Sequence, residues 1–343
     1  MRHLLNTLYV TSPENRLNLD GGNVIVSRNS EVVARIPLHT LESIVCFSYS
    51  GATPMLMGAC AEAGIDLSFF SPHGSFLART VGEERGNVLL RMEQYRISDS
   101  VEASCTYARN MVLGKVYNAR KVIERSRRDH SMRIPIEKAE RISGQLLDSL
   151  GKIRSCNDLD SLRGIEGESA QRYFDYFDDL LLQQKKEFAF KGRSRRPPMD
   201  RINALLSFVY SLLAGDSAAA LQSVGLDPYV GFMHRPKPGR RSLALDLMEE
   251  FRPVMGDRFA LTCVNQKMIQ QDHFNIQESG AVFLNDEGRR IVLRAWQEKK
   301  QDQIRHPFLN EKVEWGLIPY VQALLLARTI RGDLEAYPPF FWK

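Results

Sequence analysis

The chain has 343 residues, of which 43% are hydrophobic and 25% charged, a balance typical of globular proteins and a length sufficient for two domains. Its net charge of +5 is too small to indicate nucleic-acid binding by itself, so the distribution of the basic residues has to decide that question. Five scattered cysteines without a C-x-x-C pair argue against a disulfide framework and against a zinc site.

The sequence contains no feature that indicates a membrane. Met1 to Val10 has no signal h-region, and no apolar run approaches the roughly 18 residues that a membrane helix needs. We therefore expect a soluble cytoplasmic protein.

Residues 1–85 are predicted to form a small β-rich domain. Apolar and polar residues alternate in short runs, and Gly21-Gly22 supplies a tight turn between two of them. Strands are expected at about residues 17–19, 24–26, 32–38, 43–47, 65–70 and 75–81, with a helix from Pro54 to Ala63. The domain carries no recognisable chemistry, and its strand edges suit pairing with a second subunit, which predicts a dimerisation role.

From residue 86 to residue 343 the apolar period becomes helical, which predicts a larger all-α domain and an α+β fold class overall. Helices are expected over Asn87–Arg128, Pro135–Leu150, Leu159–Leu182, Ile202–Ala214, Asp257–Ile269, Trp296–Arg305 and Lys312–Arg331. Residues 271–290 should be irregular or short-stranded, and Pro319 should kink or restart the last helix.

Glu166 stands on the apolar stripe of the helix that starts at Leu159, seven residues from both Leu159 and Tyr173. An acid on an apolar face must be paired, protonated or metal-bound, because burial of a bare carboxylate is very costly. Gly164 and Gly167 flank it and suit the close approach of another backbone. A structural ion pair and a metal ligand both remain open for Glu166.

Residues 183–201 form a basic, proline-containing connection between two helices. Six Lys and Arg residues, among them Arg195 and Arg196, surround Phe188 and Phe190. Basic residues can contact phosphates and aromatic rings can stack on bases, so the segment is a candidate DNA contact. A solvated linker with two locally packed phenylalanines is the equal alternative.

His234 lies in a turn-rich loop that begins at Gly225 and leads into a helix with Ser242 as its N-cap and Pro253 as its stop. The acids of this otherwise apolar helix, Asp246, Glu249 and Glu250, occupy one arc that should face a cleft. Carboxylates three or four residues apart repel unless a cation lies between them, so Mg²⁺ or Mn²⁺ is one interpretation and a solvated acidic face the other.

Five motifs in this order resemble the CRISPR-associated protein one family, and the resemblance extends over the whole chain. They are Gly164-Ile-Glu-Gly167, Arg195-Arg-Pro-Pro-x-Asp-x-x-Asn203, Gly225-Leu-Asp-Pro-Tyr229, His234 and Ser242-Leu-Ala-Leu-Asp-x-x-Glu249. The overall pattern is most similar to members that accompany type I systems. The family is the metal-dependent DNA nuclease and integrase of spacer acquisition, with a β-rich N-terminal domain and an all-helical catalytic domain.

The resemblance implies a site built on Glu166, His234 and Glu249 as ligands of Mg²⁺ or Mn²⁺, with Asp246 as a supporting or alternative ligand. Many relatives carry aspartate where this sequence has Glu249, so direct and water-mediated coordination both remain open. His234 could alternatively act as a general base. Residues expected to grip phosphates and offset negative charge are Arg195, Arg196, Arg235, Lys237, Arg240 and Arg241.

The function that the resemblance implies is the insertion of short double-stranded DNA fragments into the repeat array, by attack of a 3′-hydroxyl on a phosphodiester. The implied partners are DNA, a second copy of the chain and the CRISPR-associated protein two. A non-catalytic DNA-binding scaffold and a repair nuclease acting on branched DNA are the alternative functions.

Overall fold

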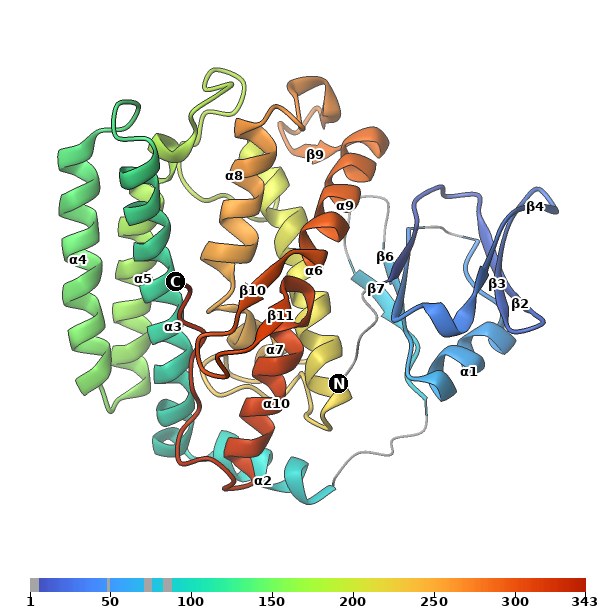
Figure 1. Ribbon diagram of the computed structural model, residues 1–343, viewed down its shortest axis with the longest axis horizontal. Helices are drawn as coiled ribbons and strands as arrows, with labels where there is room; N and C mark the ends of the chain where they lie inside the picture. The colour runs from blue at the N-terminus through green and yellow to red at the C-terminus, as the bar shows by residue number, and fades with distance from the viewer. Residues whose placement is uncertain (1–5, 48–49, 71–75, 83–87) are drawn as a thin grey trace. The chain divides into compact units, whose positions relative to one another are not determined.

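The computed structural model describes residues 6–47, 50–70, 76–82 and 88–343 (Figure 1). The chain forms two compact units, each described separately below. The first consists of Met1–Arg85, Leu284–Asp302 and Glu314–Leu317, and the second of Gly86–Phe283, Gln303–Val313 and Ile318–Lys343. The chain therefore returns to its first unit late in the sequence, which the apolar pattern did not predict.

The first unit contains two small sheets. One has the order β1(Thr7–Val10), β5(Ser43–Cys46), β6(Asp66–Phe70) and β7(Phe76–Arg79), with parallel pairing except between β6 and β7. The other is the antiparallel meander β2(Arg16–Asp20), β3(Asn23–Arg28) and β4(Glu31–Pro37). The predicted strands are confirmed, whereas β1 was missed. The predicted turn at residues 71–75 lies outside the described residues.

Sequence chemistry explains the local structure of this unit. Gly21 and Gly22 adopt φ of 52° and 74° in the β2–β3 turn, a region that glycine enters at little cost. Helix α1(Pro54–Ala63) starts with Pro54 and ends at Gly64 in the left-handed conformation, as predicted. Fully buried Leu17, Ile44 and Leu67, among others, form the core between the sheets and α1.

Two late segments complete the first unit. Helix α9(Asp286–Gln301) begins ten residues before the predicted start at Trp296, because the Asn285 side chain caps it by accepting from the Gly288 amide at 2.9 Å. A 3₁₀ turn at Trp315–Leu317 follows, and its Trp315 amide donates to the Asp302 carbonyl at 2.8 Å.

The second unit is mainly helical, which confirms the predicted fold class. Its helices are α2(Val88–Asp99), α3(Val101–Asp129), α4(Ile136–Ser155), α5(Leu159–Asp175), α6(Arg201–Ser223), α7(Ser242–Met248), α8(Arg258–Asn265) and α10(Ile318–Ile330). Helices α3, α4 and α5 pack side by side, and α6 packs against α7, α8 and α10 (Figure 1). The short ribbon of β8(Phe274–Ile276) with β9(Val282–Leu284) confirms the short-stranded segment predicted at residues 271–290. The ribbon of β10(Gln303–Arg305) with β11(Lys312–Glu314) replaces the adjoining ends of two predicted helices.

Several predicted boundaries of the helices were wrong, each for a local reason. The helix predicted over Asn87–Arg128 breaks at Ser100, whose hydroxyl accepts from the Ala103 amide at 3.2 Å and caps α3. Pro253 does not end the helical structure, because it lies in the first turn of a π-helical segment, Arg252–Asp257. A backbone N–H in the first turn has no partner within the helix, so its absence in proline breaks no helical hydrogen bond. The restart predicted at Pro319 is confirmed, because α10 begins at Ile318 directly after a 3₁₀ turn and Pro319 lies in its first turn.

Helix α6 corrects one expectation about membranes. Among the described residues it is the one helix that is long and apolar enough to cross a membrane, judged by length and composition alone. Its few polar residues leave the mean hydropathy of its most apolar stretch at 1.5. However, 61% of its apolar window is buried inside the structure, where it packs against α7, α8 and α10. Its apolar composition is therefore that of a core helix.

Candidate metal centre

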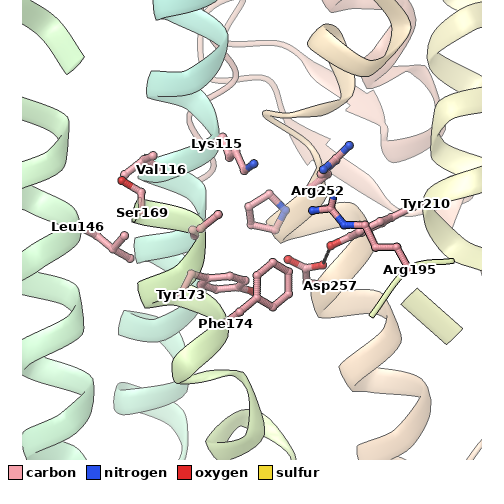
Figure 2. Close-up of a pocket in the computed structure, with 13 residues that line it drawn as sticks. Lys115, Val116, Leu146, Ser169, Tyr173, Phe174, Arg195, Tyr210, Arg252 and Asp257 are labelled. Carbon is pink, nitrogen blue, oxygen red and sulfur yellow. Dashed lines mark hydrogen bonds between the residues drawn. The ribbon is translucent and has the colours of Figure 1, made fainter. Parts of the chain in front are cut away.

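A pocket of the second unit lies where α3, α5, α6 and the π-helical segment meet (Figure 2). Its polar lining includes Lys115, Arg195, Tyr210, Arg252 and Asp257. The Tyr210 hydroxyl donates to the Asp257 carboxylate, and the guanidinium groups of Arg193 and Arg252 each lie 5.2 Å from the centroid of the Tyr210 ring. A tyrosine between two cations is thus held at the wall of the pocket.

Burial dominates the titration of Asp257. It raises the pKa of this carboxyl from 3.8 to about 6, although the hydrogen bond from Tyr210 and the charges of Arg193 and Arg252 oppose the rise. The same burial, together with the neighbouring Asp257 charge, raises the pKa of the Tyr210 hydroxyl well above its usual range. The pocket therefore contains a carboxyl group that is easily protonated.

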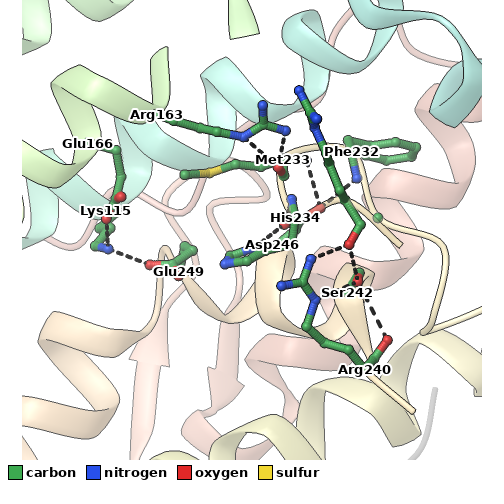
Figure 3. Close-up of polar contacts among 12 residues, drawn as sticks. Lys115, Arg163, Glu166, Phe232, Met233, His234, Arg240, Ser242, Asp246 and Glu249 are labelled. Carbon is green, nitrogen blue, oxygen red and sulfur yellow. Dashed lines mark hydrogen bonds and ion pairs between the residues drawn. The ribbon is translucent and has the colours of Figure 1, made fainter. Parts of the chain in front are cut away.

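Two carboxylates from different helices converge on one cation beside this pocket (Figure 3). The Lys115 ammonium of α3 pairs with Glu166 of α5 and, at 2.6 Å, with Glu249 at the end of α7. The Glu249 side chain is only 3% exposed and also pairs with Arg252 at 3.2 Å. Burial opposes ionisation of Glu249, but the positive charges of Arg252 and Lys115 lower its pKa from 4.5 to about 2.

His234 is oriented by the fully buried Asp246. One Asp246 oxygen lies 2.6 Å from His234 Nδ1, and the carboxylate also accepts the backbone amides of Phe232 at 2.6 Å, Met233 at 3.0 Å and His234 at 3.0 Å. Because this carboxylate is an acceptor, Nδ1 is the donor and Nε2 is left as the acceptor of the ring. Glu249 lies between Lys115 and His234 in Figure 3.

The loop that carries His234 is fixed from two sides. A Cβ on Gly231 would lie 2.7 Å from the Asp246 carboxylate, so only glycine fits where the loop crosses α7. Arg163 of α5 donates to the Met233 carbonyl at 3.0 Å through Nε and at 2.6 Å through its terminal nitrogen. Since Arg163 and Glu166 share a helix, this contact couples the position of His234 to that of Glu166.

The residues present fit a divalent cation. Glu166 and Glu249 already share one cationic group, and within the described residues Glu249 Oε2 has no partner other than Lys115. Two carboxylates and an imidazole nitrogen are a donor set that Mn²⁺ and Mg²⁺ accept. Throughout the described ranges, however, no three Asp, Glu, His or Cys side chains form a group that could hold a metal ion as they stand. The Lys115 ammonium lies between the two carboxylates instead.

The basic residues predicted to contact DNA fall into two groups. Arg195 lines the pocket and Arg196 is exposed beside it, before the cis-proline Pro197. On the loop after His234, Arg235 and Lys237 are exposed, and Arg235 lies 3.6 Å from Asp160.

The other two basic residues of the His234 loop are half-buried, Arg240 and Arg241. Arg240 donates to the Arg235 carbonyl and, at 3.2 Å, to the Ser242 hydroxyl, so this hydroxyl braces the loop. The predicted N-cap role of Ser242 is wrong, because the N-cap is Arg241 and no side chain caps α7.

Comparison with known proteins identifies the family. A family model described as CRISPR associated protein Cas1 matches residues 8–298. The chain belongs to the Cas1 family. It is 45% identical over 343 residues to the CRISPR-associated endonuclease Cas1 1 of Chlorobaculum tepidum, with 100% of both chains covered.

Solved structures show the same fold at lower identity. A casposase bound to its integration product has a TM-score of 0.84 at 21% identity and covers 98% of this chain and 94% of its own. A Cas6-RT-Cas1–Cas2 complex has a TM-score of 0.80 at 22% identity and covers 100% of this chain and 36% of its own. The chain thus has a fold shared by Cas1 proteins and a casposase.

Three residues of this Cas1 site were missed from the sequence: Lys115, Arg163 and Arg252. Lys115 did carry a signal, because it is the one charged residue in the apolar run Met111–Val116 of a predicted helix. Arg163 and Arg252 lie beside Glu166 and Glu249 in sequence and looked like ordinary surface charges. Their partners belong to other elements, which sequence spacing cannot reveal.

Proposed function

We propose that this Cas1 protein is the metal-dependent DNA endonuclease and integrase of CRISPR adaptation. It joins the 3′-hydroxyl ends of short double-stranded DNA fragments to the repeat array by transesterification, and with water as the attacking group it hydrolyses DNA. The observation that carries the proposal is the convergence of Glu166 and Glu249 on one cation position beside the oriented ring of His234. The name of the relative from C. tepidum, an endonuclease, supports it.

Membership of this family implies a metal-dependent enzyme, and we assign the ion as Mg²⁺ or Mn²⁺. Glu166, Glu249 and His234 Nε2 would hold it. Asp246 acts on His234 instead of on the metal, because both of its oxygens already accept from the loop. When bound, the ion polarises the phosphodiester and lowers the pKa of the attacking oxygen.

The chain's own residues position the DNA and offset charge. Arg252 and Arg195 face the pocket beside the carboxylates, where the negative charge of a phosphate in its transition state can be stabilised. Arg235 and Lys237, exposed on the loop after His234, contact the DNA backbone. Arg196, Arg240 and Arg241 contribute to the same positive surface.

The partners follow from the same proposal. The protein binds double-stranded DNA, forms a homodimer through its β-rich N-terminal domain of residues 1–85, and assembles with Cas2 in the cytoplasm. A solved structure of the same fold is part of a complex with Cas2, which supports that partner. The catalytic domain in this proposal spans residues 86–343.

Removal of a ligand tests the enzyme. Glu166→Ala or His234→Ala should abolish joining and cleavage of protospacer DNA with a supercoiled repeat plasmid and Mn²⁺, because the ion loses a donor. DNA affinity measured by fluorescence anisotropy should change little. Glu168→Ala is the matched control: Glu168 lies two residues from Glu166 on α5 but pairs with Arg172 at the surface, so this variant should keep full activity. Full activity of the Glu166 and His234 variants would refute the assignment.

The same assay separates the alternative functions. A wild-type protein that binds DNA normally but neither joins nor cleaves it would be a scaffold. A wild-type protein that cleaves branched DNA without any requirement for a repeat sequence would be a repair nuclease using the same residues.

A further inference from the structure

Lys115 occupies an unusual place for a lysine. It lies in the middle of α3, and its side chain is only 12% exposed. Its ammonium group bridges Glu166 and Glu249, which are themselves 18% and 3% exposed. The three groups come from three different helices, so tertiary packing places this cation, and neighbouring residues of α3 do not (Figure 3).

This position has an electrostatic cause. Two carboxylates held together away from water repel each other strongly, and burial of either without a cation is costly. Arg252 balances only the second oxygen of Glu249, at 3.2 Å, and makes no ion pair with Glu166 in the described structure. Without Lys115, the pair Glu166–Glu249 would therefore carry an uncompensated negative charge.

A divalent ion held by Glu166 and Glu249 would need the same oxygens. A lysine ammonium is a cation and donates hydrogen bonds, so it cannot coordinate a metal and would be repelled by one. The two cations therefore exclude each other at Glu249 Oε2. Lys115 lines a pocket whose opposite side carries Arg195 and Tyr210, so its side chain has space to move away from the carboxylates (Figure 2).

We propose that Lys115 is a built-in counter-ion that holds the two metal-binding carboxylates together in the metal-free protein and gives up this place when the metal binds. The inference rests on the proposed function, because it assigns Glu166 and Glu249 as ligands. Lys115 thereby stabilises the metal-free site and weakens the apparent metal affinity, since binding requires its displacement. Such a residue keeps the ligands preorganised and raises the metal concentration that is needed to fill the site.

Substitution of Lys115 by an uncharged residue tests this role in the full-length protein. Lys115→Met should lower the melting temperature without metal and tighten the dissociation constant for Mn²⁺ on the order of tenfold, measured by isothermal titration calorimetry. The rise in melting temperature on addition of Mn²⁺ should be larger than in the wild type. If Lys115→Met does not fold without metal, Lys115→Gln supplies an uncharged hydrogen-bond donor at the same position and should show the same tightening.

Lys121→Met is the matched control. Lys121 lies on the same helix but pairs at 3.5 Å with Glu124 outside the site, so its loss should leave the Mn²⁺ affinity unchanged. Unchanged or weaker Mn²⁺ binding in folded Lys115→Met and Lys115→Gln, with normal binding in the wild type, would overturn the inference alone. Absence of Mn²⁺ binding in the wild type and in both variants would overturn the proposed function as well.

Discussion

At the scale of single residues, the site is built from charges that would be unfavourable alone. Asp246 is fully buried yet accepts three backbone amides and the His234 ring, so its charge is compensated. Glu249 is compensated by Lys115 and Arg252. Asp257 is compensated least, because its hydrogen bond from Tyr210 and its two nearby arginines do not offset burial, and its pKa rises.

Asp257 should make stability depend on pH. Its pKa of about 6 in the folded protein exceeds 3.8, so between these values the folded state retains a proton that the unfolded state has lost. The free energy of unfolding therefore falls as pH rises from about 4 to about 6, because the folded state gives up this proton less easily than the unfolded state. The total loss should be on the order of 3 kcal/mol. Asp257→Asn stays neutral and should remove this decline.

Urea unfolding of the metal-free protein at several pH values measures this effect. The exposed Asp148 of α4 provides the control, because Asp148→Asn should leave the wild-type pH dependence intact. Parallel stability curves for wild type and Asp257→Asn across this pH range would contradict the assignment.

The sequence predicted the acids and the histidine better than their partners. Glu166 was selected because it stands on an apolar stripe, and Asp246 and Glu249 because they interrupt an apolar helix. Both signals come from the spacing of an acid relative to nearby apolar residues, and this spacing can be read directly from the sequence. The pairing of Lys115 with both Glu166 and Glu249 depends on how three helices pack, so the spacing left the choice between ion pair and metal ligand open.

At the scale of elements, α3 connects the site to the C-terminal tail, which consists of residues 331–343 after α10. Lys115 on α3 contacts the carboxylates, and three residues later Asn118 holds both the chain after α7 and the tail. A Cβ on Gly114 would lie 2.8 Å from Glu250 Cβ, so α3 and this segment approach closely only because the residue is glycine. Glu250 in turn accepts the Phe340 amide at 2.6 Å. Glu250 therefore binds the tail, in contrast to the cleft-facing position expected for it.

Loss of the Asn118 amide should destabilise this arrangement. Its Nδ2 donates to the carbonyls of Glu250 at 2.7 Å and Phe340 at 2.8 Å, and its Oδ1 accepts the Trp342 amide at 2.9 Å, all in a fully buried position. Asn118→Ala leaves three backbone groups without partners, so we expect a loss of about 2–4 kcal/mol in the free energy of unfolding.

Urea denaturation measures the loss, and limited proteolysis should cut the tail of Asn118→Ala sooner than that of the wild type. The exposed Asn157 accepts from Arg109 at 2.8 Å and serves as control, because its substitution by alanine should cost far less. Equal stabilities of the two variants would show that Asn118 does not brace the tail.

At the scale of the whole molecule, the change from an alternating to a helical apolar period near residue 86 predicted the fold class. The likeness to a solved structure at a TM-score of 0.84 agrees with it. The late return of α9 to the first unit was not predictable, because its apolar face has the same period whichever unit it packs against. Helix boundaries were missed for a related reason: Pro253 reads as a stop signal, but here it begins a π-helical segment that continues into α8.

The net charge of +5 says little about DNA, so the position of the charges should decide binding. The double variant Arg235→Ala/Lys237→Ala removes two exposed cations beside His234 and should weaken DNA binding for all sequences alike. The slope of log affinity against log salt should become shallower by about 2, because two phosphate contacts are lost. Arg290→Ala/Arg294→Ala removes two exposed cations of α9 and should leave the slope unchanged. Equal slopes in all three proteins, measured by fluorescence anisotropy, would exclude the His234 loop from the DNA interface.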